Sequence, residues 1–191
     1  MGPSSHPVQR AVPATVADLE MLPDNVKGEI LEGVLYTQPR PRARHQRIGT
    51  RVSAELGSPF DWGRQGPGGW LILIEPGIEL PGSPEFSPDI AAWRRARLPH
   101  LPEDALDLAP DWVCEVHSPS TRGYDLVTKR RFYAKIGVGY LWYIDPDAQS
   151  LSVSKLVDEH WYEVGVWGGS DLVRAEPFDA IEIPVREWWE N

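Results

Sequence analysis

Two apolar segments of the sequence each carry one carboxylate, and this feature constrains the fold more than any other. Asp89 lies within residues 88–93, and Glu115 lies within residues 112–116. Both segments have the length and composition of a β-strand. A carboxylate buried in a strand is costly unless it is paired or binds a metal ion. If the two strands are neighbours, their carboxylates meet at one point, and a divalent cation would relieve their repulsion.

The carboxylate pair has two interpretations, and the residues alone leave both open. Mg²⁺ favours a site with one or two carboxylates, retained waters and substrate phosphate oxygens. A metal held there could activate water and stabilise charge on a phosphodiester. Alternatively, each carboxylate pairs with an arginine or lies in solvent at the end of its strand.

The pattern of helices and strands predicts one α/β (α+β) domain, a mixed central sheet flanked by helices. Residues 1–14, rich in proline and serine, are expected to form a mobile tail, and residues 15–191 the domain. We expect helices near residues 15–23, 43–56, 125–136 and 186–189, and a strand or hairpin at 29–36. Strands are predicted at 70–75, 77–80, 88–93, 112–116 and 140–144, followed by three antiparallel ones within 151–174. Residues 81–87 are expected to be a loop.

Lys129 is the third candidate for chemistry. It lies four residues after Asp125 on the predicted helix, so the two side chains share a face and can pair with each other. Alternatively, Lys129 reaches the carboxylate site, where it would orient the attacking water or stabilise charge on a phosphate.

Several motifs, taken together, resemble the Uma2 family over roughly residues 15–190. They are Gly28-Glu-Ile-Leu-Glu-Gly-Val-Leu35, His45-Gln-Arg-Ile48, Ser87-Pro-Asp-Ile90, Glu115-Val-His-Ser-Pro-Ser-Thr121, Asp125-Leu-Val-Thr-Lys129 with Tyr133, and Gly137-Val-Gly-Tyr-Leu-Trp-Tyr-Ile-Asp-Pro146. The resemblance implies the PD-(D/E)xK nuclease fold, which is restriction-endonuclease-like, with a mixed central sheet and helices on both faces.

The same resemblance implies roles for particular residues. Asp89 and Glu115 would bind the metal, Glu29 would be a further acid near it, and Lys129 would be the lysine of the family. In the wider superfamily this lysine lies two residues after the glutamate, a position that His117 occupies here. His117 is therefore a lesser candidate for that role.

Charge limits how such a protein could bind nucleic acid. The net charge of −9 weighs against broad electrostatic binding but leaves room for a local basic groove. His45, Arg47 and Arg122 are the candidates for phosphate contact, although they could equally be solvated or cap a helix. They belong to two basic clusters: Arg40, Arg42, Arg44, His45, Arg47 and Arg51, and Arg122, Lys129, Arg130, Arg131 and Lys135.

These observations favour a Mg²⁺- or Mn²⁺-dependent endonuclease acting on DNA. The alternative is a binding module for nucleic acid or protein that keeps the nuclease fold without catalysis.

The lone cysteine, Cys114, excludes an intramolecular disulfide and a thiolate metal site. We expect a cytoplasmic protein that does not bind membranes, since no secretory signal or membrane-length apolar run is seen. Trp188 and Trp189 could pack a final helix or form a homodimer contact.

Overall fold

The centre of the fold is a six-stranded mixed sheet. The computed structural model describes residues 6–8 and 12–190. The strand order is β11 (His160–Gly168), β10 (Ser150–Val157), β9 (Tyr140–Asp145), β8 (Trp112–Val116), β7 (Ile90–Arg94) and β4 (Trp70–Ile74). Strands β8 and β9 run parallel and the other neighbours run antiparallel. Strand β8, in the middle, is buried on both faces along its whole length.

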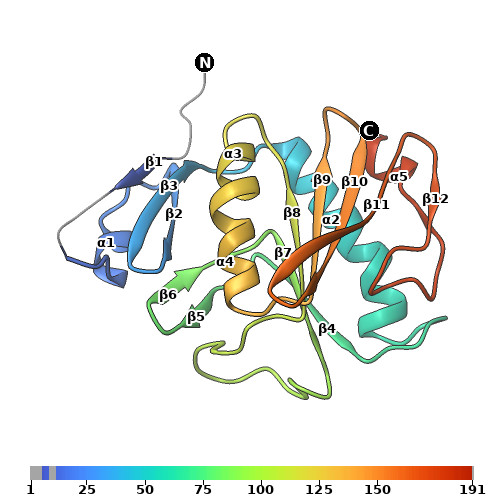
Figure 1. Cartoon of the computed structure of the whole chain (residues 1–191), viewed down its shortest axis with the longest axis horizontal. Helices are drawn as coiled ribbons and strands as arrows, with labels where there is room; N and C mark the ends of the chain where they lie inside the picture. The colour runs from blue at the N-terminus through green and yellow to red at the C-terminus, as the bar shows by residue number, and fades with distance from the viewer. Residues whose placement is uncertain (1–5, 9–11, 191) are drawn as a thin grey trace.

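Helices cover both faces of this sheet (Figure 1). On one face lies α2 (Ala43–Leu56), whose buried Ile48, Val52 and Leu56 recur at a spacing of four and so form one apolar stripe. It continues into a π-helical turn, η1 (Gly57–Asp61), and α5 (Arg186–Trp189) packs in the same core. On the other face, α3 (Arg122–Tyr124), the π-helical turn η2 (Asp125–Lys129) and α4 (Arg130–Lys135) follow without a break.

A second sheet lies beside the main one and contributes one acid to the site. Its strand order is β1 (His6–Val8), β3 (Val34–Pro39), β2 (Val26–Leu31), β6 (Ser83–Phe86) and β5 (Ile78–Leu80). Strands β2 and β3 form a tight hairpin whose turn residues, Glu32 and Gly33, both have positive φ. The short helix α1 (Val16–Glu20) precedes this hairpin, and Asp18 accepts a hydrogen bond from the backbone N–H of Thr15. A small pair, β12 (Leu172–Val173) and β13 (Ile183–Pro184), completes the fold.

The predicted mixed sheet with helices on both faces is confirmed, with local corrections. The expected loop at 81–87 contains strand β6, so that prediction is wrong. Asp89 directly precedes β7 instead of lying inside it. Residues 6–8 of the predicted tail pair with β3, because that edge of the hairpin offers unpaired backbone groups. The rest of the tail prediction at residues 1–5 and 9–11 lies outside the described residues.

In the described parts of the chain, no helix has the length and apolar character that spanning a membrane requires.

Candidate active site

Asp89 and Glu115 face each other at the ends of two paired strands. Ile90 of β7 is opposite Cys114 of β8, so the next position in this antiparallel register brings Asp89 opposite Glu115. Each carboxylate accepts a hydrogen bond from a backbone N–H of the other segment. Val116 N–H donates to Asp89 Oδ2 at 2.8 Å, and Asp89 N–H donates to Glu115 Oε2 at 3.4 Å. The carboxylates therefore meet as the sequence predicts, and the pairing of the strands is the reason.

Lys129 lies between two glutamates from different sheets. Its Nζ is 3.0 Å from Glu115 Oε1 and 3.1 Å from Glu29 Oε1, and all three side chains are almost completely buried. Tyr133 O–H donates to Glu115 Oε1, and Tyr124 O–H donates to Glu29 Oε2 at 2.9 Å. This arrangement fixes the ammonium and both carboxylates in a hydrogen-bonded network.

The helix that carries Lys129 places it by means of a π-helical turn. In η2, both Asp125 and Lys129 are buried, whereas the intervening Leu126 and Val127 are exposed. The intrahelical Asp125–Lys129 pair, one of the two sequence interpretations, is not the contact that Lys129 makes. Its hydrogen bonds go to Glu29, to Glu115 and, at 3.5 Å, to the carbonyl of Ser87. Single π-turns of this kind occur often at functional sites.

Asp89 is the carboxylate of the pair that solvent reaches. Its side chain is 13% exposed, and His45 of α2 contacts its Oδ2 at 2.9 Å. Burial acts to raise the pKa of Asp89, but the hydrogen bond and charge of His45, with Lys27 and Lys129, outweigh it and lower the pKa to about 2. Burial acts to lower the pKa of His45, and Asp89 more than compensates, so this pKa is raised.

Glu115 has the opposite electrostatic character. Burial is the main cause that raises its pKa to about 7, and the charges of Asp89 and Glu29 add to burial against the attraction of Lys129. Burial also raises the pKa of Asp125, with Glu115 as the next cause. Burial and the charges of neighbouring carboxylates therefore raise the pKa of both Glu115 and Asp125.

His117 lies two residues beyond Glu115, on the same face of the chain. Its ring stacks on Tyr143 with centroids 4.6 Å apart. Its Nε2 atom is buried and has no hydrogen-bond partner among the residues that the structure describes. Burial first, and then the charge of Arg122, lower the pKa of His117 to about 4. This lowered pKa favours the uncharged imidazole at neutral pH.

The predicted phosphate-contacting residues differ in their distance from the carboxylates. His45 lies directly on Asp89. Arg122 is exposed and its Nη1 is 2.6 Å from Asp145 Oδ2, at the end of β9. Arg47, on α2, is exposed to solvent. The structure thus brings His45 into the carboxylate cluster and leaves Arg122 and Arg47 on the surface.

Two residues of the site were not identified in the sequence. Tyr124 holds Glu29 from the helix that also carries Lys129. Lys27, two residues before Glu29 on β2, has its Nζ 3.4 Å from the carbonyl of Ser87. The i, i+2 spacing of Lys27 and Glu29 on a strand was the one available signal, because such residues share a face.

The residues fit a divalent cation bound by two carboxylates. Asp89 Oδ1 accepts no hydrogen bond from the described residues, and Glu115 Oε2 accepts only the long one from Asp89 N–H. Two carboxylates with open coordination positions are what Mg²⁺ uses beside substrate phosphates. The described residues contain no group of three or more His, Cys, Asp or Glu side chains arranged for a metal. Glu29, expected as a further acid at the metal, has both oxygens engaged by Lys129 and Tyr124, so we assign it to holding Lys129.

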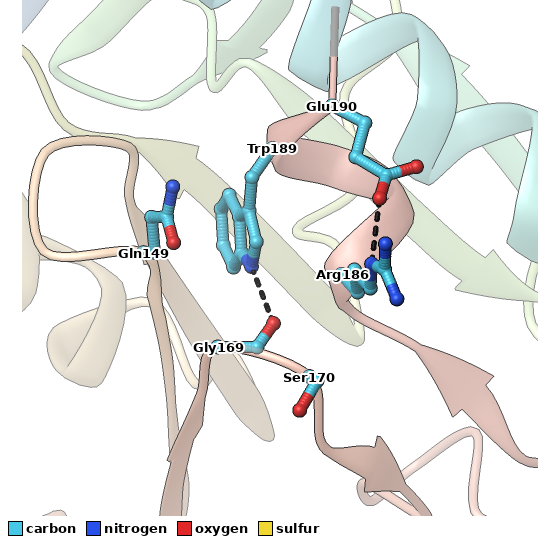
Figure 2. A pocket seen from close by; sticks show the side chains of 6 residues that line it. All are labelled: Gln149, Gly169, Ser170, Arg186, Trp189 and Glu190. Carbon is cyan, nitrogen blue, oxygen red and sulfur yellow. Dashed lines mark hydrogen bonds and ion pairs between the residues drawn. The ribbon is translucent and has the colours of Figure 1, made fainter.

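A cavity of about 450 Å³ lies elsewhere, beside α5 (Figure 2). Trp189 Nε1 donates to the carbonyl of Gly169 across it, and Arg186 pairs with Glu190 at 2.6 Å. None of the carboxylate-site residues lines this cavity.

Comparison with known proteins places this geometry in a family. The family model "Uma2: Putative restriction endonuclease" matches residues 14–186. Among solved structures, the chain resembles one titled as a putative nuclease belonging to DUF820 from Anabaena variabilis ATCC 29413. The TM-score is 0.71 at 21% identity, over 93% of this chain and 98% of that one. At this identity the likeness establishes the fold. No curated protein matches the chain.

Proposed function

The chain belongs to the Uma2 family, and from this premise we propose that it is a metal-dependent endonuclease that hydrolyses phosphodiester bonds of DNA. Asp89 and Glu115 would bind Mg²⁺ or Mn²⁺. Lys129 would act on the same site from the opposite side of Glu115. The observation that carries the proposal is the cross-strand carboxylate pair, whose Asp89 Oδ1 is left without a hydrogen bond from the described residues.

The charge of the cluster supports a cation at this position. Glu29 and Glu115 share one buried ammonium, that of Lys129, and burial and neighbouring carboxylates raise the pKa of Glu115 to about 7. A proton can supply the missing positive charge, and so can a metal ion. A divalent cation bound there would lower the pKa of a coordinated water and stabilise charge on the phosphodiester.

The protein side chains would prepare this site rather than react covalently. His45 orients Asp89 through its hydrogen bond to Oδ2, which leaves Oδ1 directed away from that contact. Lys129 and Tyr133 fix Glu115 through Oε1, which leaves Oε2 for a ligand. Glu29 and Tyr124 hold Lys129 in turn. Such fixed hydrogen bonds reduce the reorganisation needed when charge develops on the substrate.

Nicking of supercoiled plasmid DNA with Mg²⁺ or Mn²⁺ tests the proposal. We expect cleavage by the wild type and a loss of at least about a hundredfold in Asp89→Asn and Glu115→Gln, because each change removes one metal ligand. Glu163→Gln is the matched control, since Glu163 is an exposed acid on β11 at the far edge of the sheet. No cleavage by the wild type with either metal, or equal cleavage by Asp89→Asn, would refute the proposal.

A second function, a binding module without catalysis, is favoured by the net charge of −9 and by the absence of a three-ligand metal group among the described residues. It predicts that the protein retains DNA or a protein partner but binds no Mn²⁺. Calorimetry distinguishes the two functions, because the endonuclease requires Mn²⁺ binding that Glu115→Gln abolishes.

The predicted homodimer can be tested by sedimentation analysis, which measures the oligomeric state. Trp188, one of its two suggested contacts, is buried in the protein core instead.

A further inference from the structure

Lys27 and Lys129 share the same two acceptors. Lys129 Nζ lies 3.1 Å from Glu29 Oε1 and 3.5 Å from the carbonyl of Ser87. Lys27 Nζ lies 3.9 Å from the same Glu29 oxygen and 3.4 Å from the same carbonyl. Two ammonium groups therefore flank Ser87, two residues before Asp89. The Lys27 charge is also one of those that lower the pKa of Asp89.

The two lysines differ in what lies on their other side. Lys129 is 2% exposed and its remaining partner is the buried Glu115. Lys27 is 17% exposed, and its remaining partner is Glu75, which is 45% exposed and 3.4 Å away. Lys129 is thus confined to the interior, whereas solvent reaches part of the Lys27 side chain.

Glu75 is fixed beside the site by its backbone. Its N–H donates to the carbonyl of Asp89 at 2.9 Å, and its φ of 45° lies in the left-handed region that non-glycine residues seldom adopt. Its carboxylate contacts Lys27. An ion pair whose acid is this exposed contributes little to stability, so a phosphate could replace Glu75 at small cost.

We propose that Lys27 is a phosphate-binding residue of this site. When nucleic acid binds, the Lys27 ammonium separates from Glu75 and contacts a backbone phosphate instead. The inference rests on the proposed function and extends it, because it assigns the solvent-facing cation separately from the buried Lys129. Lys27 would position the strand over Asp89, and Lys129 would keep Glu115 in place beneath it.

Salt-dependent binding of a short fluorescent DNA duplex tests this assignment. The duplex is titrated with full-length protein in Ca²⁺ at several salt concentrations, and gels verify that it stays intact. Each phosphate contact adds about one unit to the slope of log affinity against log salt concentration. Lys27→Met should lower that slope by about one unit, and Lys27→Arg should keep it. A purely structural role would leave the slope unchanged.

The chain offers a matched ion pair as control. Lys155 and Glu176 also form a Lys–Glu pair open to solvent, at 2.6 Å. Lys155 is opposite Tyr140, at the start of β9, whereas the site lies at the carboxyl end of the neighbouring β8. Lys155→Met makes the same charge change and should leave the slope within error of wild type. Glu75→Gln should tighten binding more than Glu176→Gln, because only the former releases Lys27.

The outcomes separate this inference from the proposed function. If the wild type binds and nicks DNA but Lys27→Met keeps the wild-type salt slope, the role of Lys27 is refuted and the nuclease proposal stands. If Lys27→Met and Lys155→Met lower the slope equally, the effect is one of net charge and the assignment also fails. If the wild type binds no DNA, both fail. Urea unfolding of each variant establishes that the comparison is made between folded proteins.

Discussion

Lys129 is the shared cation of two buried glutamates, so its removal leaves both without their main partner. Breaking a buried ion pair by deleting one member costs about 3–5 kcal/mol, because an uncompensated charge remains. We expect Lys129→Met to lower the free energy of unfolding by about that amount in urea denaturation. Lys135→Met is the control: Lys135 pairs with Glu32 on the surface, and its loss should cost about 1 kcal/mol or less.

Glu29→Gln should partly rescue the Lys129→Met protein. Glu29 has the Lys129 ammonium on one oxygen and the Tyr124 hydroxyl on the other. Once Lys129 is absent, neutralising Glu29 removes one of the two uncompensated charges. The double variant should therefore unfold at a higher urea concentration than Lys129→Met alone. Equal or additive destabilisation would show that Glu29 and Lys129 do not interact as the structure describes.

Asp145 provides a prediction about pH. Burial acts to raise its pKa, but the backbone N–H of Ala148 and the Arg122 charge outweigh it, so the pKa lies below the ordinary 3.8. A carboxyl with a lowered pKa in the folded state stabilises the fold above pH 3.8, and this stability is lost as pH falls through the lowered value. Asp145→Asn should therefore reduce the free energy of unfolding at neutral pH and flatten its decline in acid. An unchanged acid profile would contradict the prediction.

At the scale of single residues, the sequence identified those whose role follows from local pattern. Asp89 and Glu115 stand out because a carboxylate in an apolar strand needs a partner. Lys129 was ambiguous, because Glu29 lies 100 residues away on the second sheet and no local pattern indicates that contact. Lys27 and Tyr124 were missed for the same reason: their significance depends on where Ser87 and Glu29 lie in three dimensions.

At the scale of elements, two glycines predict opposite effects of alanine. Gly49 lies within α2, and a Cβ there would meet nothing within 4 Å. Gly49→Ala should stabilise the protein by about 0.5–1 kcal/mol, because alanine is the better helix former. Gly137 ends the helix α4 with φ of 79°, also in open space. Gly137→Ala should destabilise by about 1 kcal/mol, because an L residue is strained there.

Thermal unfolding of the two glycine variants provides the measurement. Both substitutions add the same methyl group into open space, so the difference between them isolates the backbone conformation. The melting temperature should rise for Gly49→Ala and fall for Gly137→Ala. Shifts of the same sign in both variants would contradict the assigned helix boundary.

The elements that the sequence predicted well are those with strong local signals. The α2 stripe recurs every four residues, and β8 is a continuous apolar run, so both were found close to their observed bounds. Strand β6 was missed because Pro84 and the preceding Pro81-Gly82 are typical of a loop. It forms because the β2–β3 hairpin gives it a partner: Glu32 N–H bonds to Ser83 Oγ, and Ile30 pairs with Glu85.

At the scale of the whole molecule, the site is assembled from both sheets and both helical faces. Glu115 comes from β8 of the main sheet and Asp89 from the position directly before β7. Glu29 comes from the second sheet, Lys129 from η2 and His45 from α2. A metal ion that binds this folded arrangement and not the unfolded chain should stabilise the entire domain. The expected gain is about 2.7 kcal/mol at a free ion concentration one hundred times the dissociation constant.

Calorimetric titration of the metal-free protein with Mn²⁺ measures whether Asp89 and Glu115 form a divalent-cation site. We predict saturable binding to the wild type and to the Glu163→Gln control, and its loss in both Asp89→Asn and Glu115→Gln. Each of these last two changes removes one carboxylate while keeping the side-chain shape. Absence of Mn²⁺ binding in the wild type, or undiminished binding in Asp89→Asn and Glu115→Gln, would show that this carboxylate pair is not a metal site.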